Sequence, residues 1–167
     1  DARPDQLITF TRCHYETLPI QYRDLLSAAP NQTGTFQLSG SIRDGYLACL
    51  ASRTASRVLL TLGSVPLDSP EAMYGGVRAL PWEEHLAPEG TLAIDVVGQG
   101  PQWLRHSQFA AQKAKDAIVD RFRERDGTRP SVDLGSPDLR INLSLMRERA
   151  SVSIDLSGEP LHRRGYR

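Results

Sequence analysis

The chain has 167 residues, enough for one large domain or two small ones, and no stretch approaches the roughly 18 consecutive apolar residues of a membrane helix. Hydrophobic residues are 40% and charged residues 24% of the chain, as in soluble globular proteins, and the formal net charge is zero. That balance argues against a nucleic-acid binder driven by overall positive charge, but it leaves room for a local basic patch.

The N-terminus and the cysteines bear on the compartment. The first residues, "DARPDQLITF", lack a basic segment followed by an apolar one, so no secretory signal is visible. Cys13 and Cys49 are far apart in sequence, and we expect two free thiols. Both features predict a cytoplasmic protein.

The first part of the chain alternates strands and helices. Residues 7–13 and 34–40 are predicted strands, and an amphipathic helix is expected over about 20–28. A second helix follows in "SIRDGYLACLASRTASR", with its large apolar side chains on one face: Ile42, Tyr46, Leu47 and Leu50. This order predicts a small α+β unit.

From residue 56 the elements are longer. "RVLLTLG" and "TLAIDVVG" read as strands, and "SPEAMYGGVRAL" reads as a short helix with Ser69 as its N-cap. The longest helix spans 105–125 and ends at Asp126-Gly127. "PDLRINLSLM" and "ASVSIDLSG" alternate as two strands, which "RER" at 147–149 joins into a hairpin. The carboxylates of Glu83 and Glu84 are assigned to a solvated turn.

A strand, Gly98-x-Gly100 and a helix together resemble a cofactor-binding loop. The third glycine of that motif is missing, Pro101 and Trp103 crowd the segment, and a turn between strand and helix is the better interpretation. No CxxC, HExxH or GxSxG motif occurs, so the sequence predicts neither a metal centre nor a catalytic nucleophile.

The long helix is the best candidate for contact with an anion. At 100° per residue its apolar residues form one face: Ala110, Ala114, Ala117, Ile118 and Phe122. The opposite face mixes both charges, since Asp116 and Asp120 lie beside Lys113 and Arg123, with Lys115 at the boundary. That pattern favours a salt-bridged, solvated face. The N-terminus of the helix, with Arg105, His106 and Ser107, is the better phosphate site because its backbone N–H groups are free. A second basic group, Arg163, Arg164 and Arg167, is either a phosphate clamp or a basic tail.

Four segments carry a resemblance to a known family: "ASRTASRVLLTLG", "SQFAAQKAKDAIVDRFRE", "SPDLRINLSLMRERASVSIDLSG" and "LHRRGYR". Together they resemble the THUMP module of bacterial 23S rRNA guanine-N2 methyltransferases over residues 46–167. The first 45 residues resemble the small ferredoxin-like domain that precedes THUMP in those enzymes. The resemblance implies an α+β fold with a ferredoxin-like subdomain (1–45), a THUMP α/β domain with a mixed sheet and a C-terminal hairpin (46–160), and a linker (161–167) toward a methyltransferase domain.

The resemblance also implies a function. It implies an RNA-binding module that docks structured 23S rRNA and positions a guanine for a covalently linked catalytic domain, which uses S-adenosylmethionine. The DPxCGSG-like loop and the NPPY-like tetrapeptide of such catalytic domains do not occur here, so no cofactor and no catalytic residue are expected within these residues, and neither a membrane nor DNA is an expected partner. The residues expected to contact RNA are Arg105, Ser107, Gln108, Lys113, Lys115, Arg163 and Arg164.

Three alternatives remain open from the sequence. A THUMP module of a tRNA-modifying enzyme would share the same fold. A protein-interaction module that only orients a neighbouring domain would agree with the zero net charge and the mixed helix face. A free-standing enzyme would use Gly98-x-Gly100 for a cofactor.

Overall fold

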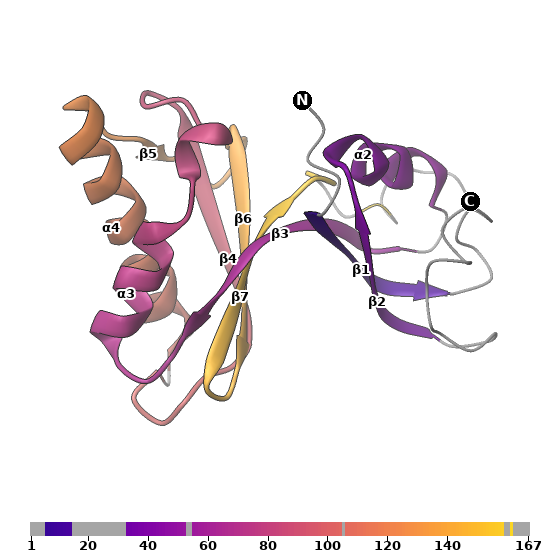
Figure 1. Cartoon of the computed structure of the whole chain (residues 1–167), viewed down its shortest axis with the longest axis horizontal. Helices are drawn as coiled ribbons and strands as arrows, with labels where there is room; N and C mark the ends of the chain where they lie inside the picture. The colour runs from indigo at the N-terminus through magenta and orange to yellow at the C-terminus, as the bar shows by residue number, and fades with distance from the viewer. Residues whose placement is uncertain (1–5, 15–32, 53–54, 105, 159–160, 162–167) are drawn as a thin grey trace. The chain divides into compact units, whose positions relative to one another are not determined.

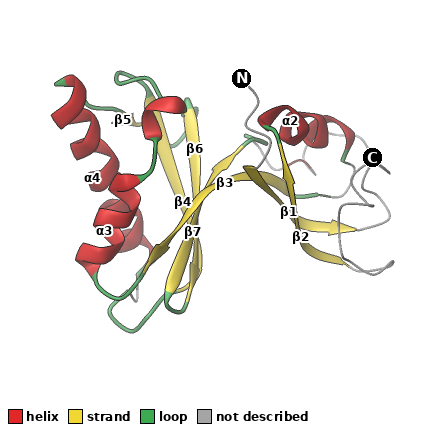
Figure 2. Cartoon of the chain, viewed as in Figure 1, coloured by secondary structure: helices red, strands yellow, loops and turns green. Residues whose placement is uncertain are grey.

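The computed structural model describes residues 6–14, 33–52, 55–104, 106–158 and 161. The chain divides into two compact units, residues 1–61 with 155–167 and residues 62–154. Helices and strands occur in both units, and the predicted α+β fold is confirmed (Figures 1 and 2). The helix expected over about 20–28 lies outside the described residues.

The first unit is built on three antiparallel strands. Strand β1 (Gln6–His14) lies between β2 (Thr33–Gly40) and the first half of β3 (Arg57–Pro66). Its centre is packed around Ile8, Phe10 and Leu60, each with no solvent exposure. Burial of such large apolar side chains is the main stabilising contribution to a sheet of this size.

Helix α2 (Ile42–Ala51) completes the described part of this unit. It begins at Ser41, whose hydroxyl accepts a hydrogen bond from the Asp44 backbone N–H, while the Asp44 carboxylate accepts one from the Ser41 backbone N–H at 2.8 Å. This reciprocal pair lowers the pKa of Asp44, chiefly through the backbone hydrogen bond from Ser41. The cap therefore explains why the helix begins where it does.

The second unit is a sheet with helices on one face. Its strands are ordered β3, β7 (Arg149–Asp155), β6 (Leu139–Met146), β4 (Thr91–Gln99) and β5 (Ser131–Val132). β4 runs parallel to β6 and β5, whereas β6 and β7 form an antiparallel hairpin. The mixed sheet and the hairpin were predicted. The two-residue strand β5 was not, because two residues are too short to show an alternating pattern.

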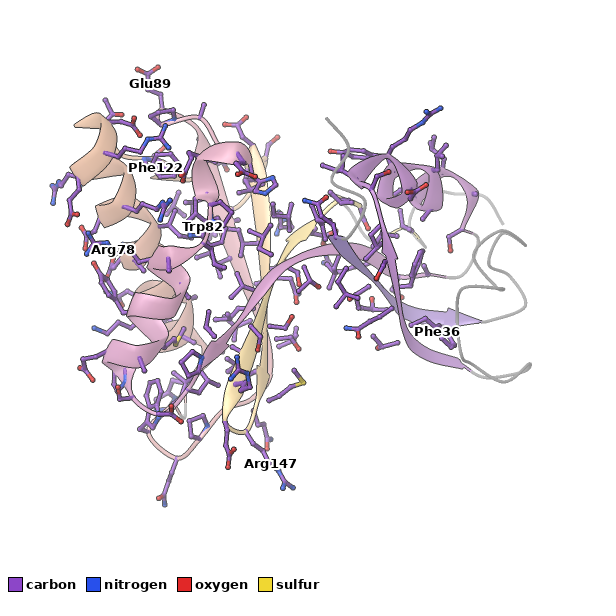
Figure 3. The ribbon with its side chains drawn as sticks, viewed as in Figure 1. Phe36, Arg78, Trp82, Glu89, Phe122 and Arg147 are labelled. Atoms are coloured by element: carbon purple, nitrogen blue, oxygen red, sulfur yellow. The ribbon has the colours of Figure 1, made fainter. Side chains whose placement is uncertain are left out.

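Helices α3 (Pro70–Ala79) and α4 (Ser107–Asp126) both cover the same face of this sheet (Figure 1). Ser69 caps α3 as predicted, since its hydroxyl accepts from the Ala72 N–H at 3.0 Å. The face of α4 predicted to be buried is buried, including Phe122 at 1% exposure. Figure 3 shows Trp82 and Phe122 in the layer between helices and sheet, and the indole N–H of Trp82 donates to the Val77 carbonyl at 2.7 Å.

A short 3-10 helix, η2 (Trp82–Glu84), corrects the assignment of Glu83 to a solvated turn. The Glu83 side chain is only 27% exposed and accepts two hydrogen bonds from the guanidinium of Arg121 on α4. The sequence missed this contact because the two residues are far apart in the chain. The pair ties η2 to the middle of α4.

Candidate nucleic-acid interface

A hollow of about 400 Å³ lies where β4 ends and α4 begins. Its lining includes two glutamines, Gln99 and Gln102, and the first helical residue, Ser107. The rest of the lining is Gly98, Gly100, Pro101, Leu104 and Leu145. The hollow therefore combines a polar rim with the start of the longest helix.

The two glycines of the predicted turn are explained by close packing. Gly98 has φ +85°, and a Cβ added there would lie 2.3 Å from the carbonyl oxygen of Leu145 on β6. A Cβ at Gly100 would lie 2.9 Å from the Leu104 side chain. Gly98 therefore needs glycine for the course of its backbone, and a side chain at Gly100 would displace Leu104, in both cases independently of any bound group.

Helix α4 offers backbone donors at its first turn. His106 occupies the N-cap position without a side-chain capping bond, and Ser107 and Gln108 are exposed. The N–H groups of an uncapped first turn point along the helix axis and attract anions. Arg105, predicted to reinforce this site, lies outside the described residues.

An aromatic pair fixes the loop before α4. The indole N–H of Trp103 donates to the carbonyl of Leu67 at 2.9 Å, and its ring meets the ring of Phe109 edge-on, with centroids 6.5 Å apart. Such pairs restrict both side chains. These contacts hold the loop that carries Gln102 against Leu67, the residue that follows β3. The polar rim of the hollow therefore has a defined position.

Lys113 is turned toward α3. Its ammonium lies 5.7 Å from the centroid of the Tyr74 ring, and the Tyr74 hydroxyl donates to Asp120 at 2.8 Å. The bond to Asp120 is the main reason why the pKa of Tyr74 is raised. Asp120 is thus held by a tyrosine of a neighbouring helix, a contact that the spacing of charges along α4 did not indicate.

Lys115 lies on the other flank of α4. Residues two apart on an α-helix are about 200° apart around its axis, so Lys113 and Lys115 cannot point the same way. The Lys115 ammonium is 2.9 Å from a carboxylate oxygen of Asp116, in a surface pair with both side chains more than a third exposed. Such pairs exchange readily with solvent and other ions.

The structure thus brings only some of the predicted contacts together. Ser107 and Gln108 are neighbours at the start of α4, beside the hollow, whereas Lys115 lies about two turns along the helix and Lys113 on its opposite flank. Arg163 and Arg164 lie outside the described residues. Gln99 and Gln102 were missed, although two glutamines flanking a Gly-Pro turn after a strand were visible in the sequence.

Other site classes find no support in the described part of the chain. No three His, Cys, Asp or Glu side chains gather there in a way that could hold a metal ion. None of its helices is long and apolar enough to cross a membrane. The Cys49 side chain is buried.

Comparison with known proteins places these features in a family. The profile of the THUMP domain matches residues 68–155, which nearly coincide with the second compact unit. Over 128 residues the chain is 51% identical to the ribosomal RNA large subunit methyltransferase K/L of Syntrophotalea carbinolica, covering 77% of this chain and 18% of that protein. The chain therefore spans about a fifth of the length of this curated relative.

Solved structures share the fold. A predicted N6-adenine-specific DNA methylase from Listeria monocytogenes superposes with a TM-score of 0.75 at 22% identity, covering 98% of this chain and 43% of that one. SMU.472, a putative methyltransferase complexed with SAH, superposes with a TM-score of 0.73 at 25% identity, covering 98% of this chain and 44% of its own. Since the matching THUMP profile covers more than half of the chain, the chain belongs to the THUMP domain family.

Proposed function

We propose that this chain is the RNA-binding module of an rRNA methyltransferase that acts on a guanine exocyclic amine of 23S rRNA. The observation that carries the proposal is the 51% identity, over 128 residues, to a protein named ribosomal RNA large subunit methyltransferase K/L. In this proposal the module docks structured rRNA, and a linked catalytic domain binds S-adenosylmethionine and transfers the methyl group.

The proposed domain organisation follows the predicted one, with a ferredoxin-like subdomain over 1–45, a THUMP domain over 46–160 and a linker over 161–167. The THUMP match over 68–155 supports the middle part. The compact units divide the chain differently, after Thr61, and residues 155–167 belong to the first unit. The proposed domains follow the resemblance in sequence, whereas the compact units follow packing.

The proposed contact surface begins at the N-terminus of α4. Ser107 and Gln108 would bind a phosphate together with the backbone N–H groups of the first turn, and Lys115 would reach a second phosphate along the strand. Lys113, Arg105, Arg163 and Arg164 complete the predicted contacts. Contacts of this kind set the register of an RNA on the protein and carry little sequence information, which suits a module that positions a substrate.

Fluorescence anisotropy with a labelled 23S rRNA hairpin tests the proposal. We expect binding whose log affinity falls with log salt at a slope of about −2 to −3, as for three or four phosphate contacts. A tRNA and a DNA duplex of equal length serve as competitors. Tighter binding of tRNA would favour a tRNA-modifying enzyme, and affinity that does not change with salt would contradict the phosphate contacts.

Two variants sharpen the test. Ser107→Asp places a negative charge at the proposed phosphate site, and we expect it to weaken RNA binding by about tenfold. Arg123→Gln removes an exposed positive charge near the other end of the same helix and should leave affinity almost unchanged. Equal effects of the two variants would mean that only the overall charge matters.

A further inference from the structure

Helix α2 exposes its large apolar side chains. Leu50 is 79% exposed, Tyr46 is 52%, and Leu47 and Ile42 are 40% and 38%. Ile42, Tyr46 and Leu50 follow each other at four-residue spacing and therefore form one stripe, with Leu47 beside it. We call these four residues the α2 stripe. Exposed apolar groups that are scattered singly need no explanation, but a contiguous stripe marks an interaction surface.

The inward face of α2 is built from small residues. Gly45, Ala48 and Cys49 are the buried positions of the helix, and a Cβ at Gly45 would lie 2.5 Å from the Leu156 side chain. The helix thus packs closely through its small residues and has no need of the α2 stripe for its own packing. The stripe is a second apolar face of α2, and it is available to a surface outside the described residues.

The chemistry of the α2 stripe favours a protein over RNA. Three of its four side chains are aliphatic, and the carboxylate of Asp44 beside them is engaged in the helix cap. Arg43 is the cation on the helix. Aliphatic side chains neither bind phosphate nor stack well on bases, whereas they form the buried centre of protein interfaces.

The length of the relatives supports one occupant, a part of the same polypeptide beyond the matched residues. This chain covers 18% of the rRNA methyltransferase relative and 44% of the putative methyltransferase complexed with SAH, so most of each polypeptide lies outside the matched part. The described chain leaves β7 into the unit that carries α2, and its last described residue, Leu161, is buried there with its N–H bonded to the Ser56 carbonyl at 3.0 Å. A segment that continues from there starts from the same unit as the stripe.

We propose that the α2 stripe is the docking surface for the methyltransferase part of the longer polypeptide, which holds the RNA-binding module in a fixed orientation. This inference rests on the proposed function only in assuming that such a part exists. It does not depend on which RNA is bound or on whether the start of α4 binds it.

The test uses the polypeptide that the gene encodes, at the length of the relatives. Amide hydrogen exchange is compared between the unchanged protein, Leu50→Gln and Leu134→Gln. Leu134 is 75% exposed in the second unit, so the control removes a leucine of nearly equal exposure elsewhere. We expect Leu50→Gln to speed exchange about tenfold in α2 and also in one patch of the methyltransferase part, and Leu134→Gln to change neither.

Other outcomes overturn the proposal. Unchanged exchange in the methyltransferase part of Leu50→Gln, or a reading frame that stops at Arg167, would exclude docking in the same polypeptide. If the 167-residue chain dimerises and Leu50→Gln abolishes the dimer, a second copy is the occupant. If Leu50→Gln weakens binding of the 23S hairpin, the stripe contacts RNA. RNA binding by Ser107→Asp is measured separately by fluorescence anisotropy. A failure of the proposed RNA binding is thereby distinguished from a failure of the α2 stripe to dock on the methyltransferase part.

Discussion

The guanidinium of Arg121 on α4 makes two hydrogen bonds, at 2.9 and 2.7 Å, to the two carboxylate oxygens of Glu83 on η2. A third bond, at 2.8 Å, runs from Arg121 to the carbonyl of Arg78 at the end of α3. One side chain therefore joins the ends of two elements to the helix that covers the sheet. A planar guanidinium suits this role because its donors diverge in fixed directions.

This pair predicts a pH-dependent stability. The hydrogen bonds from Arg121 are the main cause that lowers the pKa of Glu83 from 4.5 to about 2. A carboxylate whose pKa is lower in the folded state stabilises the fold above the unfolded pKa, and that stabilisation is lost as the pH falls from about 4.5 toward 2. We expect Glu83→Gln to lose about 1–3 kcal/mol of unfolding free energy at pH 7, and the difference from the unchanged protein to shrink to well under about 1 kcal/mol near pH 2.

Urea unfolding followed by tryptophan fluorescence measures this difference, because Trp82, next to Glu83, is fully buried. Glu89→Gln, which changes an exposed carboxylate of the same unit, is the control. A difference between Glu83→Gln and the unchanged protein that stays constant from pH 7 to pH 2 would contradict the assignment.

Two glycines in the second unit should respond oppositely to alanine. Gly98→Ala places a Cβ 2.3 Å from the Leu145 carbonyl at a positive φ, so the β4–β6 pairing must shift, and we expect a loss of more than about 2 kcal/mol. Gly75 lies within α3, and a Cβ there meets nothing within 4 Å. We expect Gly75→Ala to gain about 0.5–1 kcal/mol, because alanine favours the helix. Thermal unfolding measures the change in unfolding free energy of both variants. Equal losses of stability in the two variants would contradict the expectation, because the local surroundings of each glycine would then not matter.

The partly buried ion pair of Arg57 and Asp155 should contribute to the stability of the first unit. Asp155 has a side chain that is 1% exposed, pairs with Arg57 and accepts the Ser157 N–H at 2.9 Å. Removing its charge leaves the partly exposed Arg57 guanidinium without its partner, and we expect Asp155→Asn to cost about 1–3 kcal/mol. Asp95→Asn, in the more exposed pair with Arg140, should cost less than about 1 kcal/mol.

Both tryptophans, Trp82 and Trp103, belong to the second unit, so this loss is measured by amide exchange of Ile8 to Phe10 in β1. Faster exchange there in Asp155→Asn, with exchange in β6 unchanged, is the expected result. A uniform change across both units would mean that the substitution acts globally.

Periodicity in the sequence was enough to predict most elements. The alternating apolar residues of β6 and β7 and the buried face of α4 are local patterns, and the structure confirms them. The outward direction of the α2 stripe could not be predicted in the same way. A pattern shows that Ile42, Tyr46 and Leu50 share a face, but only the close approach of Gly45 to Leu156 shows that the other face packs.

Partners of charged residues were the least predictable part. Spacing indicated a salt-bridged face around Asp116 and Asp120, whereas the Asp120 carboxylate accepts a hydrogen bond from Tyr74 of another helix, and Lys113 lies over the Tyr74 ring. Glu83 found Arg121 across 38 positions of sequence. Such pairs depend on how helices pack, which single-element patterns do not contain. For the candidate phosphate site, the sequence predicted the N-terminus of α4 but not the hollow beside it.

The Lys115 ammonium lies 2.9 Å from a carboxylate oxygen of Asp116. If Lys115 contacts an RNA phosphate, the neighbouring carboxylate both competes for the lysine and repels the phosphate. Asp116→Asn removes the negative charge and keeps the shape, so we expect RNA affinity to rise about twofold to fivefold at low salt and the gain to shrink at high salt. Asp133→Asn, which removes a carboxylate from the loop after β5, should have a smaller effect.

Anisotropy titrations at two salt concentrations measure these changes, and the double variant Asp116→Asn/Lys115→Gln decides their origin. If the gain arises through Lys115, the double variant binds RNA no better than Lys115→Gln alone. If the gain persists without the lysine, Asp116 acts only by repelling the phosphate. In that case the second phosphate contact belongs to another residue of α4, and Gln108, on the same flank of the helix, is the first to substitute.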